Sequence, residues 1–325
     1  MEKINWGIIG CGDVTEVKSG PAFNKVEHSY LLAVMRRDEE KAADYAKRHG
    51  INRYYTVANE LIQDQEVQAV YIATPPASHE EYAVASLAAG KPVYVEKPMA
   101  LNAEGARRML SASQKSGTKL TVAHYRRFQP KYLYIKQSLE EQKIGQVLFV
   151  NLRFFQPVSS ELVANSETNW RLNREISGGG LFHDLAPHQL DLLIYFFGYP
   201  KSVRGNALNQ RKINAVDDLV AGTLIFEQDI LFNGLWSFGV DEKDSADLIE
   251  IYGSKGKMTF SAFGYDFKMN VEGESTEKTF DNIPHVEQPM IEEVNRYFRG
   301  ERLENPCSAE DAIEVMKIMD VFTSI

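Results

Sequence analysis

Hydrophobic residues in the first part of the chain come in short runs, separated by stretches with helical spacing. The runs show no alternation of apolar and polar residues, which is typical of parallel strands buried on both faces. The stretches between them are rich in strong helix formers. This order of elements predicts an α/β fold with a doubly wound domain over residues 1–123. The predicted strands are 4–9, 30–35, 69–73, 93–95 and 120–123, and the predicted helices are 39–48, 80–89 and 103–115.

The rest of the chain, residues 124–325, follows a different pattern. In the run 230–238, Phe232 and Trp236 fall on one side of a strand while Asn233 and Ser237 fall on the other. This period of two predicts an α+β domain with an open, mostly antiparallel sheet that is buried on one face. A terminal helix is predicted from its Ser308 cap to residue 322, and it remains open whether this helix packs back near the first domain. The predicted strands are 147–155, 219–226, 231–238, 248–252 and 257–260.

The composition narrows the range of possible functions. A chain of 325 residues with 44% hydrophobic and 25% charged content is long enough for two globular domains. The net charge of −9 argues against nucleic acid as a partner, because phosphate binding requires a basic surface. Two cysteines make no disulfide framework, and no run has the length or the flanks of a membrane span or signal peptide. We therefore expect a cytoplasmic protein without a membrane partner.

A glycine turn follows the first predicted strand and opens a helix. Gly10 and Gly12 allow a tight turn and a close backbone approach, and Asp13 and Val14 begin the helix. Helix N-terminal amides bind pyrophosphate, so this turn is a candidate dinucleotide site. Thr15 replaces the third glycine of the usual motif, which predicts slightly wider helix–strand packing.

The end of the second strand indicates which dinucleotide is bound. An acidic residue at this position usually accepts hydrogen bonds from the ribose of NAD. Here Arg36 and Arg37 follow the strand, and two guanidinium groups suit a 2′-phosphate. The alternative is that both arginines are solvated and Asp38 binds the ribose, but Asp38 is better suited to cap the helix that begins at residue 39. We predict NADP(H) as the preferred cofactor, with NAD(H) as the alternative.

Two further strand ends carry polar groups. Thr74 and Pro75 follow the strand at 69–73, and His79 stands where the next helix begins. Glu96 and Lys97 follow the strand at 93–95. Ligands of such sheets bind at the carboxyl ends of the strands. An ammonium group there is suited to polarising a substrate oxygen, although an isolated lysine at a loop is more commonly a surface residue.

A glycine run at 178–180 precedes three polar residues at helical spacing. Asp184, His188 and Asp191 share one helix face, and a histidine with carboxylate neighbours is suited to proton transfer near neutral pH. A metal site made of His183, Asp184 and His188 is the alternative. Since His183 lies about 100° from Asp184 around the helix, we predict no metal.

Taken together, these motifs resemble the Gfo/Idh/MocA family, which includes glucose-fructose oxidoreductase and inositol dehydrogenase-like proteins. The resemblance extends over nearly the whole chain and combines a lysine–proline element with a glycine–Asp–His element. It rests on Gly10 and Gly12, Thr74-Pro75-Pro76 with His79, 90–93 leading into Glu96-Lys97-Pro98, Arg127-Phe128-Gln129-Pro130, Trp170-Arg171, the triple glycine, Asp184 and His188.

The resemblance implies an N-terminal Rossmann domain and a C-terminal domain whose sheet builds homodimers or homotetramers. It implies that Lys97, His188 and Asp184 act at the substrate carbon, with His188 as the acid/base. The predicted cofactor contacts are Gly10, Gly12, Asp13, Val14, Arg36, Arg37, Thr74, Pro75, His79, Glu96 and Lys97. By position, the predicted substrate-lining residues are Tyr125, Arg126, Trp170 and Arg171.

The predicted function is an NAD(P)-dependent oxidoreductase that interconverts a secondary alcohol and a ketone on a sugar, cyclitol or related polyhydroxy substrate. One alternative is a glycoside hydrolase that uses tightly bound nicotinamide transiently. Another is a cofactor-sensing protein without chemistry. The sequence leaves the individual substrate and the physiological direction open.

Overall fold

The structure is a computed structural model that describes residues 2–157 and 170–324. The chain forms two compact units. Unit 1 comprises Met1–Tyr125 and Ile283–Met316, and unit 2 comprises Arg126–Asn282 and Lys317–Ile325. The chain therefore passes between the units three times.

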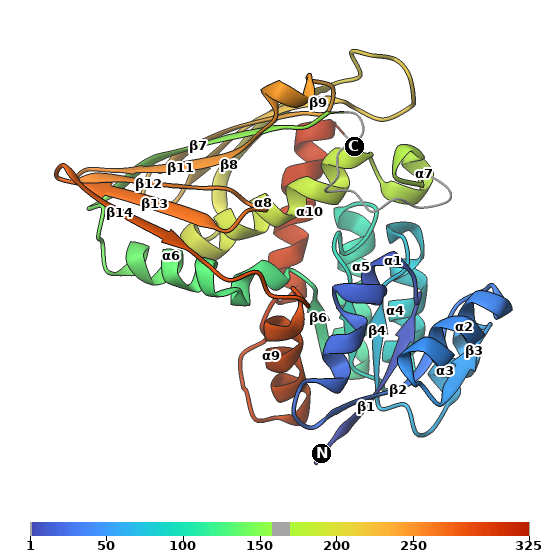
Figure 1. Cartoon of the computed structure of the whole chain (residues 1–325). Helices are drawn as coiled ribbons and strands as arrows, with labels where there is room; N and C mark the ends of the chain where they lie inside the picture. Colours follow the sequence, from blue (N-terminus) through green and yellow to red (C-terminus); the bar gives the residue numbers. More distant parts are fainter. Residues whose placement is uncertain (1, 158–169, 325) are drawn as a thin grey trace. The chain divides into compact units, whose positions relative to one another are not determined.

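Unit 1 is built on a six-stranded parallel sheet in the order β3-β2-β1-β4-β5-β6 (Figure 1). Ile9, the last residue of β1, lies beside Met35 of β2 and Ile72 of β4, and Val95 of β5 lies beside Ile72. The carboxyl ends of these strands therefore form one edge. The strands are β1 Ile4–Ile9, β2 Ser29–Met35, β3 Arg53–Tyr55, β4 Ala69–Ile72, β5 Val93–Val95 and β6 Leu120–Val122.

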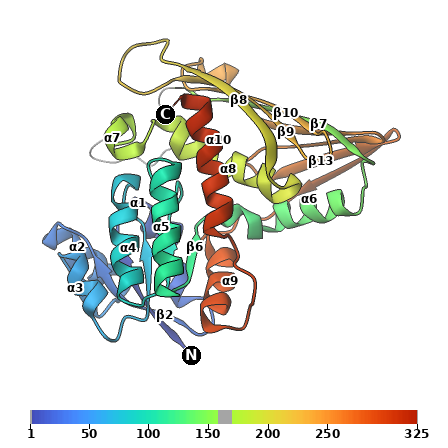
Figure 2. The same ribbon diagram turned by 180° about the vertical axis from the view of Figure 1, so that it is seen from behind.

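Helices cover both faces of this sheet, as its strand pattern predicts. Trp6 packs against Phe23 and Phe298 on one face, while the next residue, Gly7, faces Leu61 of α3 on the other. Helices α4 and α5 lie side by side (Figure 2). The α-helices of the first segment are α1 Asp13–Val17, α2 Glu39–His49, α3 Ala58–Gln63, α4 His79–Ala88 and α5 Ala103–Ser116, with 3₁₀ turns η1 Gly20–Asn24 and η2 Pro76–Ser78.

The expected division at residue 123/124 differs from the observed one, because the segment Ile283–Met316 belongs to unit 1. Helix α9 (Gln288–Arg299) buries Met290, Ile291 and Phe298, and its Asn295 accepts a hydrogen bond from the Trp6 indole. The final helix, α10 (Ala309–Thr323), begins in unit 1 and ends in unit 2. The amphipathic face of α9 therefore completes the first unit rather than the second.

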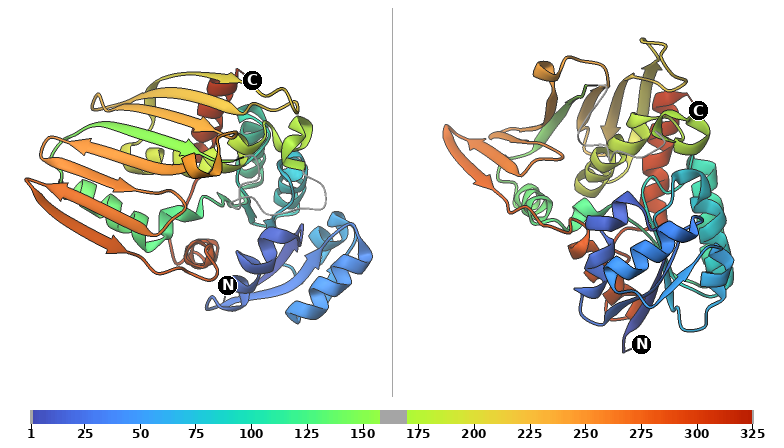
Figure 3. Two further views of the ribbon diagram at one scale, coloured as in Figure 1. Left: turned by 45° about the horizontal axis from the view of Figure 1, so that its top comes forward. Right: turned by 45° about the vertical axis from the view of Figure 1, so that its right-hand side comes forward.

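Unit 2 is built on an eight-stranded sheet in the order β14-β13-β12-β11-β7-β10-β9-β8 (Figure 3). All neighbours pair antiparallel except β10 and β7, which are parallel. The predicted open, mostly antiparallel sheet is therefore confirmed. The strands are β7 Val147–Phe155, β8 Pro200–Leu208, β9 Leu219–Phe226, β10 Leu231–Ser237, β11 Ala246–Gly253, β12 Gly256–Phe260, β13 Asp266–Val271 and β14 Glu274–Thr279.

One face of this sheet is the core of unit 2. Phe232 and Trp236 point into it, as their alternation predicts, and helices α6 (Pro130–Glu140) and α8 (Leu181–Phe197) lie along it (Figure 1). Phe322 of α10 packs over Gly205 and Gly222, where any side chain would collide with its ring. Shorter elements are η3 Tyr125–Phe128, η4 Trp170–Leu172, α7 Arg174–Ser177 and η5 Glu242–Asp244.

Every predicted strand and helix is present, with ends shifted by at most a few residues. Several elements were not predicted: β3, β8, β13, β14, α3, α6, α7 and α9. Strand β14 shows the reason, since all six of its residues are exposed and its sequence carries no apolar alternation. Among the described residues, no helix combines the length and apolarity that crossing a lipid bilayer requires.

Candidate active site

The turn after β1 is closely packed at one glycine and open at the other. Gly10 has φ +97°, and a Cβ there would lie 2.7 Å from the Thr74 amide nitrogen, so only glycine fits between the two loops. A Cβ at Gly12 would meet nothing within 4 Å. The backbone at Gly12 is thus accessible to a ligand, as a pyrophosphate contact requires. Asp13 is exposed and Val14 half-buried at the start of α1.

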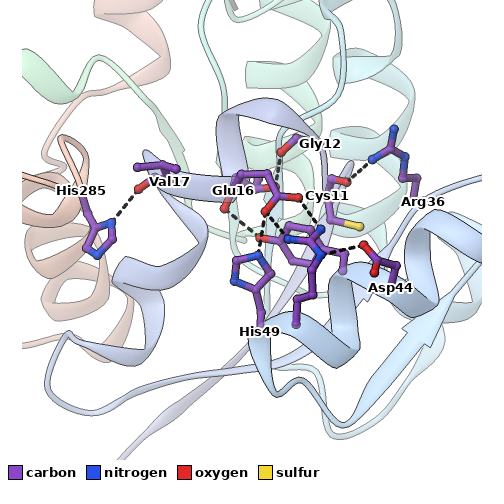
Figure 4. Close-up of polar contacts among 11 residues, drawn as sticks. Cys11, Gly12, Glu16, Val17, Arg36, Asp44, His49 and His285 are labelled. Carbon is purple, nitrogen blue, oxygen red and sulfur yellow. Dashed lines mark hydrogen bonds and ion pairs between the residues drawn. The ribbon is translucent and has the colours of Figure 1, made fainter. Parts of the chain in front are cut away.

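The helix after this turn is anchored by residues of α2. Glu16 accepts two hydrogen bonds from Arg48, at 2.7 and 2.8 Å, and lies 2.9 Å from Nε2 of His49 (Figure 4). The Arg48 hydrogen bond, with help from His49, lowers the pKa of Glu16 to about 2. The Tyr45 hydroxyl donates to the Thr15 carbonyl at 2.8 Å. Side-chain contacts thus hold the five-residue helix α1 in place.

The arginines after β2 lie beside this turn. Arg36 donates from Nη1 to the Cys11 carbonyl at 3.1 Å, so its guanidinium reaches over the glycine loop (Figure 4). Arg37 is exposed. The Asp38 carboxylate accepts from the Lys41 amide at 3.0 Å and caps α2, which confirms the predicted capping role. One oxygen of its exposed carboxylate is therefore engaged in the fold.

His79 joins the two other loops at this sheet edge. Its ring is fully buried, with Nε2 2.7 Å from the Thr74 carbonyl and Nδ1 3.0 Å from the Pro98 carbonyl. Burial lowers the pKa of His79, whereas the two carbonyl oxygens, which can both accept from the ring only when it is protonated, oppose this shift. His79 therefore ties the Thr74–Pro75 turn to the turn that carries Lys97.

Glu96 and Lys97 leave β5 with different environments. Glu96 is buried, and its Oε1 accepts from the Tyr71 hydroxyl at 2.6 Å while its Oε2 accepts from the Lys97 amide at 3.1 Å. Lys97 is half-buried, and the peptide that joins it to Pro98 is cis. Tyr125, the last residue of this part of unit 1, is buried.

In unit 2, helix α8 carries the predicted proton-transfer residues. His188 is buried, and its ring lies edge-on to Phe263 at 5.5 Å between centroids. Asp184 accepts from Nε of Arg171 at 2.6 Å, and the Arg171 guanidinium lies over the Trp170 ring. Two of the predicted substrate-lining residues are thus brought together with Asp184.

Asp191, one turn further along α8, is held by an arginine that was not predicted as a site residue. Arg127 binds both carboxylate oxygens, with distances of 2.7, 2.9 and 3.1 Å. Both side chains are almost completely buried. Removing either partner leaves an uncompensated buried charge, so the pair holds α8 firmly to η3.

Local structure explains why glycine occupies positions 178–180. Gly178 and Gly180 have φ of +87° and +80°, and a Cβ at Gly179 would lie 2.2 Å from the His183 ring. His183 is buried on another face of α8, and burial lowers its pKa to about 4. Among the described residues, no three His, Cys, Asp or Glu side chains are grouped as a metal site.

A turn after β12 also contributes to the site and was not predicted. The Asp247 carboxyl accepts from the amides of Ala262 and Phe263 at 2.8 and 2.7 Å. Lys131 donates to the carbonyls of Ser261 and Gly264. The turn presents the Phe263 ring to His188, and the Arg126 guanidinium lies 4.4 Å from the centroid of that ring.

Unit 1 thus groups a glycine turn, two arginines and a lysine at strand ends, and unit 2 places a histidine beside an arginine-held carboxylate. The groups of unit 1 are suited to binding an anionic dinucleotide. Those of unit 2 are suited to proton transfer. Each set lies within one unit.

Comparison with known proteins agrees with this division. Residues 4–124 match the model of an oxidoreductase family with an NAD-binding Rossmann fold, GFO/IDH/MocA. Residues 132–259 match the C-terminal domain of the same family.

Individual relatives extend the match over the whole chain. Oxidoreductase P35 of Formosa agariphila is 44% identical over 98% of both chains. A scyllo-inositol 2-dehydrogenase (NADP(+)) of Bacillus subtilis is 28% identical over 72% of this chain and 63% of its own. The structure of a levoglucosan dehydrogenase in complex with NADH and levoglucosan superposes with a TM-score of 0.84 at 22% identity, covering 98% of this chain and 96% of that one. The chain therefore belongs to the GFO/IDH/MocA family of oxidoreductases.

Proposed function

We propose that this oxidoreductase interconverts a secondary alcohol and a ketone on a sugar, cyclitol or related polyhydroxy compound, with NADP(H) preferred. The observation that carries the proposal is the position of Lys97. It lies half-buried at the end of β5, on the sheet edge that also carries Gly12 and Thr74. An ammonium at a nucleotide-binding edge is placed to act on an oxygen of the reacting carbon.

The residues at this edge fit a nicotinamide dinucleotide. The open space at Gly12 admits a pyrophosphate, and Arg36 and Arg37 supply positive charge directly after β2. We propose that Gly10, Asp13, Val14, Thr74 and Pro75 line the cofactor, with His79 fixing the turns behind it. The preference for NADP(H) is supported by Arg36 and by the engagement of Asp38 as a helix cap.

When bound, the nicotinamide supplies C4 as the hydride donor or acceptor. We propose that His188 exchanges the proton of the substrate hydroxyl and that Lys97 stabilises negative charge on that oxygen. Asp184, held by Arg171, orients the substrate, and Tyr125, Arg126 and Trp170 line its site. Relatives named for inositol and levoglucosan support a polyhydroxy substrate.

The test is a screen of sugars, inositols and ketosugars with NADP+, NADPH, NAD+ and NADH, followed at the nicotinamide absorbance band. Lys97→Ala and His188→Ala are expected to retain cofactor binding and to lose turnover by roughly two to four orders of magnitude. Wild-type turnover in either variant would refute the corresponding role. Release of a glycoside product without any net absorbance change would favour transient cofactor use, as in a hydrolase.

We further propose that the chain assembles as a homodimer or homotetramer through the sheet of unit 2. The face opposite α6 and α8 carries exposed apolar side chains, including Leu208 of the edge strand β8 and Leu231 of the inner strand β10, which are 53% and 38% exposed. Leu231 lies beside Phe149, and Phe149 stacks on Tyr252. Light scattering should report a dimer or tetramer, and Leu231→Glu should weaken it; a monomeric wild type would contradict the proposal.

A further inference from the structure

One buried acidic residue of unit 1 has no part in the chemistry described so far. Glu287 immediately precedes α9, in the segment that returns to unit 1, and is 1% exposed. Its side chain makes no capping hydrogen bond to α9, although its position is the N-cap. The carboxyl points instead to groups behind the lysine turn.

A tyrosine hydroxyl connects Glu287 to Glu96. The Tyr71 hydroxyl lies 2.6 Å from Oε1 of Glu96 and 3.4 Å from Oε2 of Glu287. The Tyr94 hydroxyl lies 3.5 Å from the same Glu287 oxygen. Since Glu96 also accepts the Lys97 amide hydrogen, a continuous set of polar contacts runs from Glu287 to the turn that carries Lys97.

The charges around this set favour one negative charge rather than two. Burial, followed by the like charge and the hydrogen bond of Glu96, raises the pKa of Glu287 well above its usual value. Lys18 and Lys97 are the positive groups that oppose this rise. Two adjacent buried carboxyls are costly to ionise together, which favours a proton on Glu287. The two tyrosines are buried and stay neutral, because burial raises the pKa of each hydroxyl.

We propose that Glu287 is a positioning residue for Lys97: it holds a proton at neutral pH and donates it in a hydrogen bond to Glu96. Glu96 is then held in a fixed orientation, in which it accepts the Lys97 amide hydrogen. The inference rests on the proposed role of Lys97 at the substrate oxygen. It adds a residue that lies far along the chain from the lysine–proline motif.

Infrared spectroscopy of the full chain in D₂O tests protonation without any need for activity. At neutral pD the wild type should show the carbonyl stretch of a buried protonated carboxyl, which should shift in protein labelled with ¹³C-glutamate. Glu287→Gln should remove this band, while Glu292→Gln, an exposed glutamate on the same helix, should leave it unchanged. Absence of the band in the wild type, or its persistence in Glu287→Gln, overturns the proposal.

Steady-state kinetics test whether Glu287 positions Lys97. Glu287→Gln retains a neutral donor, so turnover and its pH profile should stay within about twofold of wild type. Glu287→Leu removes the donor and should lower kcat by roughly ten- to a hundredfold, with little change in the KM for cofactor. If Glu287 were ionised, Glu287→Gln would remove a charge near Lys97 and displace the pH profile, which contradicts the proposal.

The outcomes separate this inference from the proposed function. If Lys97→Ala keeps full turnover, the function assigned to Lys97 fails, yet the infrared band still reports whether the carboxyl pair shares a proton. If the band is present but Glu287→Leu, folded by circular dichroism, keeps wild-type kcat, the positioning role fails alone.

Discussion

The two units hold their proposed functional groups by different means. In unit 1 the groups follow strands, and contacts with the main chain fix them: Gly10 abuts the Thr74 amide, and Glu96 accepts the Lys97 amide hydrogen. In unit 2 they project from helix α8, and side chains fix them: Arg171 holds Asp184, and Arg127 holds Asp191. Main-chain contacts thus hold the groups of unit 1, whereas ion pairs between side chains hold those of unit 2.

The largest effect should come from breaking the buried ion pair of unit 2. Arg127→Met removes the guanidinium that binds both oxygens of the buried Asp191 carboxylate and should lower the free energy of unfolding by about 3–5 kcal/mol. Chemical denaturation measures the loss. The control is Lys268→Met, which removes an exposed ion pair with Glu277 in the same unit and should leave the denaturation midpoint nearly unchanged. Equal losses of unfolding free energy in the two variants would show that burial does not determine how much an ion pair contributes to stability.

A smaller effect is expected at the turn that presents Phe263. Asp247→Ala removes the acceptor of two amide hydrogens and should lower the free energy of unfolding by about 1.5–3 kcal/mol. Turnover should also fall, because Phe263 packs against His188. Asp247→Asn keeps one acceptor oxygen and should recover part of both losses. Unchanged turnover in a destabilised Asp247→Ala protein would separate the turn from the chemistry.

In unit 1 the sharpest comparison is between the two arginines after β2. Arg36→Ala removes a guanidinium that reaches the glycine loop, so the KM for NADP+ should rise roughly tenfold while that for NAD+ changes little. Steady-state kinetics with both cofactors measures this. Arg37→Ala should have the smaller effect, because Arg37 is exposed. Equal Michaelis constants for both cofactors in wild type and Arg36→Ala would mean that the 2′-phosphate is not recognised here.

The smallest effect on stability is expected at Glu16, which helps to hold helix α1 in place. The folded-state pKa of Glu16 is lowered to about 2 from 4.5, so its contribution to stability is present above pH 4.5 and is lost as the pH falls towards 2. Glu16→Gln should therefore cost less than about 1 kcal/mol at pH 7, and the difference from wild type should vanish at the acid end. Denaturation curves across this range measure it. The control Glu292→Gln, at an exposed glutamate, should show no such pH dependence.

How much of the structure the sequence could predict depends on whether a contact joins residues that are close or distant along the chain. The strand ends of unit 1 and the capping role of Asp38 were predictable, because each depends on neighbours within a few residues. Arg127 was visible only as part of a motif, since its pairing with Asp191 spans 64 positions. Asp247 and Glu287 carried no sequence signal, because an acidic residue in a polar stretch looks the same whether it is solvated or buried. Contacts of this kind arise only when the chain folds.

The route of the chain has a practical consequence for protein engineering. Since Ile283–Met316 completes unit 1, unit 2 is an insertion followed by a short C-terminal extension, Lys317–Ile325. A chimera that exchanges unit 2 with that of a relative must therefore transplant both pieces, because Phe322 of the extension fills the space above Gly205 and Gly222. Swapping everything after residue 125 would instead replace α9, and with it the partner of Trp6 in the recipient.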